Sequence, residues 1–130
     1  MPDIDAALRQ VVRVQAGGQC EYCHISERLT LADHEIDHVI AVKHGGKTVA
    51  SNLALCCTVC NPFKGSDIAS IDPESGQITP LFHPRNVRWD DHFQVRDGEV
   101  LGLTAKGRVT VQLLRLNRPT RIRERQLLQE

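Results

Sequence analysis

Two pairs of cysteines have the spacing of zinc knuckles. Cys20-Glu-Tyr-Cys23 and Cys57-Thr-Val-Cys60 each separate two thiols by two residues, which lets both thiolates of a pair bind one ion. Four thiolates fill the tetrahedral coordination of Zn²⁺ and leave no position for water, so we predict a structural zinc. The 33 residues between the pairs exceed the interval of a plain zinc ribbon, which indicates an insertion. Four unrelated buried thiols would not explain the matched spacing.

The fifth cysteine, Cys56, directly precedes Cys57. Neighbouring side chains on a strand point to opposite faces. We therefore expect Cys56 to face away from the zinc as a buried thiol rather than to bind it.

The insertion carries residues suited to phosphodiester hydrolysis. Imidazole is the natural acceptor for the proton of an attacking water, and a hard cation with oxygen ligands can stabilise the leaving oxygen. Asp37 and His38 are adjacent, and Asn61 directly follows the second knuckle. On a strand Asp37 and His38 face opposite ways, so a metal ligand and a base can lie on either side of a bound phosphate.

Each of these residues also has an ordinary structural interpretation. Asp37 could pair with an arginine, His38 could be a buried histidine, and Asn52 could be a turn residue. Lys64 lies three residues after Asn61, so it could reach the same phosphate or be a solvated charge at a helix end. Their joint occurrence with the zinc knuckles favours an active site.

Taken in order, these segments resemble the HNH nuclease motif over residues 20–67, and in particular the bacterial branch whose ββα-metal unit is held by a four-cysteine zinc. The segments that carry the resemblance are Glu35-Ile36-Asp37-His38-Val39-Ile40, Gly45-Gly46, Asn52-Leu53 and Cys57-x-x-Cys60-Asn61-x-x-Lys64-Gly65.

The resemblance implies a role for each matching residue. His38 would be the general base, and Asp37 and Asn61 would bind a catalytic Mg²⁺ or Mn²⁺. Asn52 would brace the loop and help to orient the base, and Lys64 would contact phosphate.

Two positions depart from the family pattern. Ala41 stands where the family usually has proline, and Asn61 stands where many members have a second histidine. The asparagine is a variant that the family allows, and it would bind the metal less tightly.

Two neighbours of the motif have weaker claims to the site. His34 would share a strand face with His38, and Glu35 would share one with Asp37 and add negative charge near the metal. We favour a structural or a surface role for His34 and a surface role for Glu35.

The elements that position these residues follow from periodicity and turn signals. Residues 3–15 predict an amphipathic helix with Ile4, Leu8, Val11 and Val12 on one face, capped by Asp3 or Asp5 and stopped at Gly17-Gly18. Residues 35–40 and 53–57 predict strands. A short helix should begin near Cys60, with Pro62 in its first turn.

The second half resembles the tail that accompanies this HNH branch, with no chemistry attached to it. Turn residues predict hairpins at residues 68–82 and 95–101. We expect helices from Thr104 to Leu116 and from Pro119 to Gln129. The spacing of Trp89 and Phe93 suits a helical turn that packs the tail against the zinc unit.

The net charge of zero conceals an asymmetry. Residues 1–84 hold 6 Lys/Arg and 10 Asp/Glu, a net charge of −4, whereas residues 85–130 hold 10 and 6, a net charge of +4. A basic stretch near the C-terminus is either a face that tracks DNA phosphates or a solvated helix surface paired with Glu124 and Glu130. Its members are Arg115, Arg118, Arg121, Arg123 and Arg125.

The composition is that of an ordinary globular protein, with 41% hydrophobic and 25% charged residues. The chain has no repeat, no apolar stretch long enough to span a bilayer and no apolar N-terminal segment typical of a secretory signal. We therefore expect a cytoplasmic protein that does not bind membranes.

We predict a small α+β fold, a zinc-stapled ββα-metal unit with an N-terminal helix and a C-terminal hairpin and helical extension. It should form a single domain over residues 1–130, with its core at about 20–67 and the extension at about 78–130. The expected function is a metal-dependent endonuclease that acts on double-stranded DNA. The competing interpretations are a non-catalytic zinc module that binds nucleic acid and an interaction protein with a degenerate HNH fold.

Overall fold

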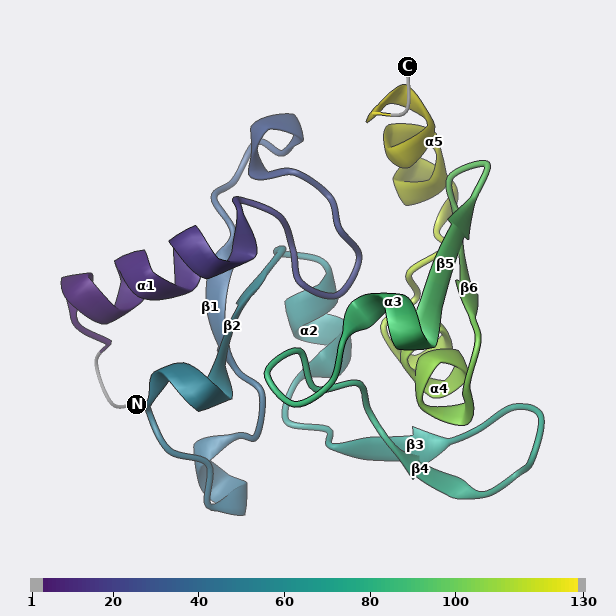
Figure 1. Cartoon of the computed structure of the whole chain (residues 1–130), viewed down its shortest axis with the longest axis horizontal. Helices are drawn as coiled ribbons and strands as arrows, with labels where there is room; N and C mark the ends of the chain where they lie inside the picture. The colour runs from purple at the N-terminus through teal and green to yellow at the C-terminus, as the bar shows by residue number, and fades with distance from the viewer. Residues whose placement is uncertain (1–3, 129–130) are drawn as a thin grey trace. The chain divides into compact units, whose positions relative to one another are not determined.

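A computed structural model describes residues 4–128 of the chain (Figure 1). It divides into two compact units, residues 1–66 and residues 67–130, and each unit is described by itself. Short antiparallel two-stranded sheets and short helices make up both units, so the predicted mixed α+β class is confirmed. Within residues 4–128 no helix has both the length and the apolar character needed to cross a membrane.

The first unit is a ββα arrangement preceded by a helix. A β-hairpin leads directly into a short helix, as the HNH resemblance implies. The elements are α1 (Ala6–Ala16), the 3₁₀ turn η1 (Glu27–Leu29), β1 (Glu35–His38), the 3₁₀ turns η2 (Val42–His44) and η3 (Ala50–Asn52), β2 (Leu53–Cys56) and α2 (Cys60–Lys64).

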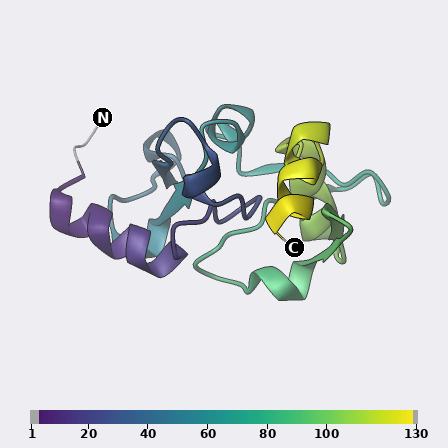
Figure 2. The ribbon, with the colours of Figure 1, turned by 90° about the horizontal axis from the view of Figure 1, so that it is seen from above.

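The helix α1 packs on β2 (Figure 2). The Asp5 carboxylate caps its start by accepting a hydrogen bond from the Leu8 amide at 2.8 Å, and Gly17 ends it at φ +65°. The buried face repeats every four residues and consists of Ile4, Leu8, Val12 and Ala16, packed around Leu53 and Leu55. The prediction that Val11 shares this face is wrong, because a stripe of this spacing leaves Val11 half in solvent. The alternative cap, Asp3, lies outside the described residues.

The strands β1 and β2 pair in antiparallel register, with Asp37 opposite Ala54 and His38 opposite Leu53. β1 ends at His38, two residues before the predicted end. Beyond it, the amide and the carbonyl of Ile40 bond the Asn52 side chain, both at 2.9 Å. The chain leaves the ladder because these polar groups are satisfied by a side chain instead of a neighbouring strand.

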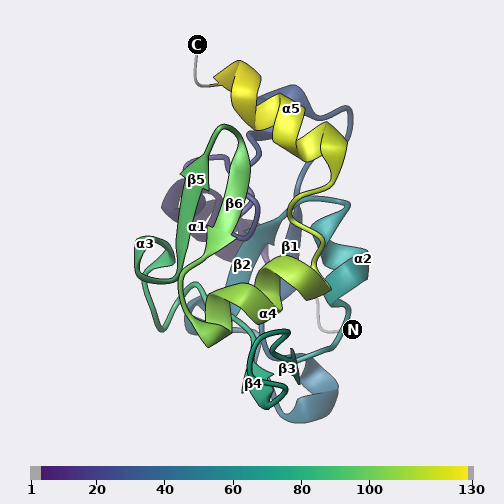
Figure 3. The ribbon, with the colours of Figure 1, turned by 90° about the vertical axis from the view of Figure 1, so that its right-hand side faces the viewer.

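The second unit places a central helix against two hairpins (Figure 3). Its core includes Phe82, Phe93, Val100, Val109, Leu114 and Leu116. The elements are β3 (Ala69–Ile71), β4 (Ile78–Pro80), α3 (Trp89–His92), β5 (Phe93–Arg96), β6 (Glu99–Gly102), α4 (Ala105–Leu113) and α5 (Pro119–Leu128).

The helix α4 begins at the predicted cap, where Thr104 Oγ1 accepts a hydrogen bond from the Gly107 amide at 3.1 Å. A Cβ at Gly107 would lie 2.1 Å from the His92 carbonyl oxygen, so only glycine lets the helix pass this close. The half-buried Trp89 ring packs on Phe93 with 4.9 Å between centroids.

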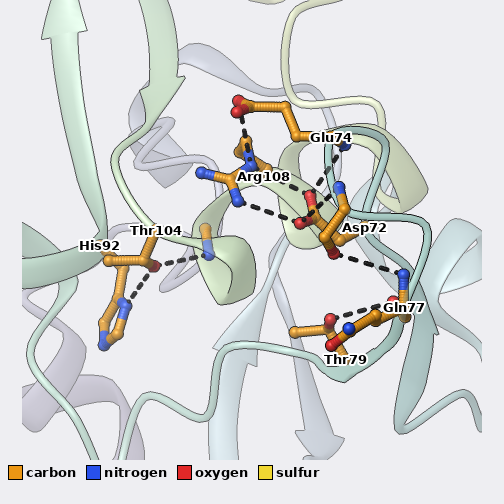
Figure 4. Close-up of polar contacts among 9 residues, drawn as sticks. Asp72, Glu74, Gln77, Thr79, His92, Thr104 and Arg108 are labelled. Carbon is orange, nitrogen blue, oxygen red and sulfur yellow. Dashed lines mark hydrogen bonds and ion pairs between the residues drawn. The ribbon is translucent and has the colours of Figure 1, made fainter.

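An ion pair fixes the first hairpin of this unit to α4 (Figure 4). The fully buried Asp72 carboxylate accepts hydrogen bonds from Arg108 Nε and Nη2, each at 3.0 Å. It also accepts the amides of Glu74 and Ser75 at 3.3 and 3.2 Å. These donors, with the Arg108 guanidinium first among them, hold the pKa of Asp72 well below its usual range.

Candidate active site and zinc centre

The four predicted zinc ligands converge at one point of the first unit. The sulfurs of Cys20, Cys23, Cys57 and Cys60 all lie within 4.8 Å of one another, and all four side chains are buried. The Cys23 and Cys57 sulfurs are 3.7 Å apart. In each knuckle the amide of the second cysteine approaches the first sulfur, at 3.5 Å in one and 3.3 Å in the other. The predicted structural zinc site therefore has its full set of ligands.

The chemistry of this cluster suits Zn²⁺. Burial raises the pKa of the Cys20 thiol, and the neighbouring thiols, Cys20 foremost, raise those of Cys23 and Cys60. Zn²⁺ reverses this preference because it binds thiolates. A zinc held by four thiolates would have no open coordination position, so it would stabilise the fold and would not activate water.

Asp37 lies on β1 and is held by two donors. Tyr22 donates its hydroxyl to Asp37 Oδ2 at 2.9 Å. Lys64 Nζ lies 3.1 Å from the same oxygen and 3.4 Å from Oδ1. Burial raises the pKa of Asp37, although the Lys64 ammonium and the Tyr22 hydroxyl both favour the charged carboxylate. Burial also raises the pKa of Tyr22, so its hydroxyl keeps the proton that it donates.

His38, the next residue on β1, is half-buried. Its Nε2 lies 2.9 Å from Thr48 Oγ1, in the loop that joins β1 to β2. This contact fixes the orientation of the His38 ring, and Nδ1 takes no part in it. A ring held in this way can take up a proton at Nδ1 when Nε2 carries the hydrogen of the Thr48 bond.

Asn52 closes the loop that carries Thr48. Its amide nitrogen donates to the carbonyl oxygens of Ile40 and Lys47, both at 2.9 Å, and its amide oxygen accepts the Ile40 amide. Gly46 completes the closure, because a Cβ there would lie 1.7 Å from the Ile40 oxygen. Asn52 therefore determines where Thr48 meets His38.

Asn61 lies at the start of α2 and is half-buried. Its Nδ2 donates to Glu35 Oε1 at 3.1 Å, which orients the amide and leaves its oxygen as an acceptor. Glu35 shares a face of β1 with Asp37, since the two are separated by one residue. Oxygen donors from β1 and from α2 thus belong to one side of the hairpin.

Residues 20–67 match a family model described as HNH endonuclease. The HNH resemblance is confirmed for this segment. A search of curated proteins and a search of solved structures each find no match. The HNH segment contains both knuckles, β1, β2 and α2, and therefore every predicted site residue.

Lys64 of the HNH segment is placed differently from either sequence interpretation. Only 1% of its side chain is exposed, so it is not a solvated helix-end charge and its ammonium does not face solvent to meet a phosphate. Its third contact is the backbone oxygen of His38 at 3.3 Å. Lys64 therefore holds the two adjacent residues on β1.

Sequence singled out one further residue of the HNH segment and missed two. Cys56 is buried, and its sulfur is not among the four that converge, which agrees with the expectation of a buried thiol that is not a ligand. Tyr22 and Thr48 gave no signal in sequence, since their partners lie 15 and 10 residues away.

Of the two roles that we favoured for His34, structural and surface, the structure shows the structural one. Its ring is buried, and Nε2 lies 3.0 Å from the Ile25 carbonyl oxygen. It precedes β1, which begins at Glu35. The strand geometry that would bring it beside His38 is therefore not present.

In the second unit the basic stretch is not a single exposed surface. Arg121 and Arg125 are buried. Arg125 donates to the carbonyl oxygens of Gly98 and Leu116, and Arg121 pairs with Glu124 at 2.8 Å. Both alternatives drawn from sequence put all five arginines on a surface, and for these two that is wrong. Arg115 and Arg123 are exposed.

Proposed function

We propose that this protein is a metal-dependent endonuclease that hydrolyses phosphodiester bonds in double-stranded DNA. The observation that carries the proposal is the pair Asp37-His38 on β1 inside the HNH segment. Asp37 is turned to the buried side, where Tyr22 and Lys64 hold it, and His38 is fixed by Thr48 with Nδ1 outside that contact.

His38 is the general base in this proposal. Its Nδ1 accepts a proton from water while Nε2 donates to Thr48, so the imidazole becomes an imidazolium as the water oxygen bonds to phosphorus. The bond from phosphorus to the 3′ oxygen breaks, which leaves a 5′-phosphate and a 3′-hydroxyl. Asn52 acts through the loop that it closes, since that loop supplies Thr48.

The oxygen donors on the same side of the hairpin suit a hard divalent ion. Asp37 keeps acceptor capacity on Oδ1, because a carboxylate has about four lone-pair directions and two of its three contacts with Tyr22 and Lys64 are made by Oδ2. Asp37 and Asn61 would hold Mg²⁺ or Mn²⁺. The ion would supply positive charge beside the leaving 3′ oxygen.

Contacts with the DNA backbone would come from exposed cations of the second unit, such as Arg115 and Arg123, and these contacts carry no base information. Binding would therefore weaken with salt and show little sequence preference. Arg121 and Arg125 are assigned to the fold and not to DNA, because both are buried.

The test is plasmid nicking in the presence of Mg²⁺ or Mn²⁺. We expect His38→Ala to lower the nicking rate at least about a hundredfold, as loss of a general base does. His44→Ala is the matched control, since His44 is an exposed histidine of the same loop. Equal rates in wild type and His38→Ala would refute the base assignment. A zinc-loaded wild type that binds DNA, but that neither binds Mn²⁺ nor cuts the plasmid, would favour the non-catalytic nucleic-acid module.

A further inference from the structure

Of the two side chains that hold Asp37, one comes from a zinc knuckle and the other from the helix that follows the second knuckle. Tyr22 lies between the two cysteines of the first knuckle, and Lys64 lies four residues after Cys60 in α2. We propose that Tyr22 is a positioning residue that sets the Asp37 carboxylate for its catalytic ion, and that the zinc site fixes Tyr22. The proposal rests on the proposed nuclease function for the ion, but the Tyr22–Asp37 contact can be tested without it.

Tyr22 is buried within a knuckle whose backbone is closed by hydrogen bonds. Its side chain is 1% exposed. The Cys20 amide donates to the Ile25 oxygen, and the His24 amide donates to the Cys20 oxygen, both at 2.9 Å. A bridge between Gln19 and Ser26 closes the base of the turn. The knuckle therefore presents the Tyr22 hydroxyl from a fixed backbone.

The same knuckle is fastened to β2. The Glu21 amide donates to the Leu55 oxygen at 2.9 Å, and the Leu55 amide donates to Glu21 Oε2 at 2.8 Å. Leu55 pairs with Ile36 on β1, next to Asp37. The donor and its acceptor are thus fixed to one hairpin, so their separation is set by the sheet and the zinc together.

As a consequence, the two oxygens of the Asp37 carboxylate have different surroundings. Oδ2 receives both Tyr22 and the closer approach of Lys64, whereas Oδ1 receives only Lys64 at 3.4 Å. Rotation of the carboxylate about its last bond is soft in the absence of such contacts. Tyr22 keeps Oδ2 on the buried side and leaves Oδ1 for the ion, in the way that partners of a metal-binding carboxylate set its orientation.

The first measurement is Mn²⁺ affinity of the zinc-loaded protein, by electron paramagnetic resonance without DNA. Tyr22→Phe keeps the ring and removes the hydroxyl, and we expect its dissociation constant for Mn²⁺ to rise about 10–100-fold. Thr58→Val is the matched control, because it removes an exposed hydroxyl from the other knuckle and should bind Mn²⁺ as wild type does. Wild-type affinity in Tyr22→Phe would overturn the proposal.

The second measurement is the rate at which the protein releases zinc to a chelator, for wild type, Tyr22→Phe, Asp37→Asn and the double variant. We expect Tyr22→Phe to raise the zinc-release rate about tenfold or more, because it removes a hydrogen bond to a charged group. We expect Tyr22→Phe to raise the release rate by a clearly smaller factor when Asp37→Asn is already present. If Tyr22→Phe raises the rate by the same factor with and without Asp37→Asn, the proposed coupling through the Tyr22–Asp37 contact is refuted.

The two measurements separate failure of the proposal from failure of the proposed function. A wild type that binds no Mn²⁺ and cuts no DNA would refute the nuclease. The zinc-release comparison would still decide whether Tyr22 couples the knuckle to Asp37, because it needs neither Mn²⁺ nor DNA.

Discussion

The ion pair of Asp37 and Lys64 is almost wholly removed from water, with exposed side-chain fractions of 6% and 1%. Desolvation of two such charges costs several kcal/mol each, and it is offset only when their hydrogen bonds are satisfied. Lys64 directs its ammonium at both Asp37 oxygens and at the His38 carbonyl, and Tyr22 adds a further donor to Asp37. Neither charge is left without a counterpart.

Loss of either partner should therefore be severe. We expect Lys64→Met to lower the free energy of unfolding of the zinc-loaded protein by about 3–5 kcal/mol, because the Asp37 charge stays buried without its cation. Urea denaturation measures this. Lys43→Met is the control, since Lys43 is an exposed residue of η2 and should change stability by no more than about 0.5 kcal/mol. A similarly small loss for Lys64→Met would mean that the pair does not form in solution.

Asp72 should give the second unit a dependence on acid. Its pKa is lowered by Arg108 and the turn amides, so its stabilising contribution is present above the pKa of about 3.9 of the unfolded state and is lost as the pH falls toward the folded-state pKa. We expect Asp72→Asn to lower the Tm at pH 7, with a difference from wild type that shrinks in acid.

Thermal unfolding followed from neutral pH into acid tests this. Asp97→Asn is the control, because Asp97 is exposed with φ +51°, a conformation that asparagine also accepts. A difference between Asp72→Asn and wild type that stays constant into acid would contradict the assignment to the ionised carboxylate.

The zinc ligands were predictable residue by residue, because the two-residue gap in each knuckle is itself the geometry of a shared ion. The partners of Asp37 and His38 were not predictable. Thr48 meets His38 only because Asn52 and Gly46 fold the loop back. The burial of Lys64 depends on how α2 packs against β1, which no local pattern specifies.

At the scale of elements, β2 delivers two adjacent cysteines to the zinc region. Cys57 belongs to the cluster of four cysteines that could hold the ion, while Cys56 is buried at the end of the strand and lies outside that cluster. We expect Cys56→Ser to retain one zinc per chain and Cys57→Ser to lose it, measured by metal analysis of the purified protein. Loss of zinc in Cys56→Ser alone would show that the ligand set includes the strand residue.

The hairpins and the caps were predictable because their signals are local. The residues around Asp72-Pro73 and Asp97-Gly98 form turns where expected, and Thr104 caps α4. The face of α5 was not predictable, since Arg125 reaches the Gly98 oxygen 27 residues away. From the sequence of a helix alone, a charged side chain is predicted to face solvent, and only the tertiary structure shows a buried partner.

At the scale of the whole chain, we expect zinc binding and folding to be coupled in the first unit. All four zinc ligands lie in residues 1–66, and the second unit has a hydrophobic core of its own. A chelator should therefore abolish hydrogen-exchange protection in the first unit, because structural zinc supplies folding free energy. The amides of α4 should stay protected.

Hydrogen exchange with mass spectrometry before and after chelation checks this. Protection lost together in both units would instead support the predicted single domain over residues 1–130. Zinc loss should also be promoted by acid, since the raised pKa values of Cys20, Cys23 and Cys60 favour the protonated, metal-free thiols.

The chain contains one tyrosine and one tryptophan, and the structure assigns one to each unit. Tyr22 donates its phenol to a carboxylate beside the zinc knuckle, and Trp89 packs on Phe93 in the second unit. Each half of the molecule thus has its own intrinsic fluorophore. The fluorescence of the selectively excited Trp89 indole reports on the folding of the second unit, and the phenol band of Tyr22 reports on the knuckle. The folding of both halves can therefore be observed in one unlabelled sample.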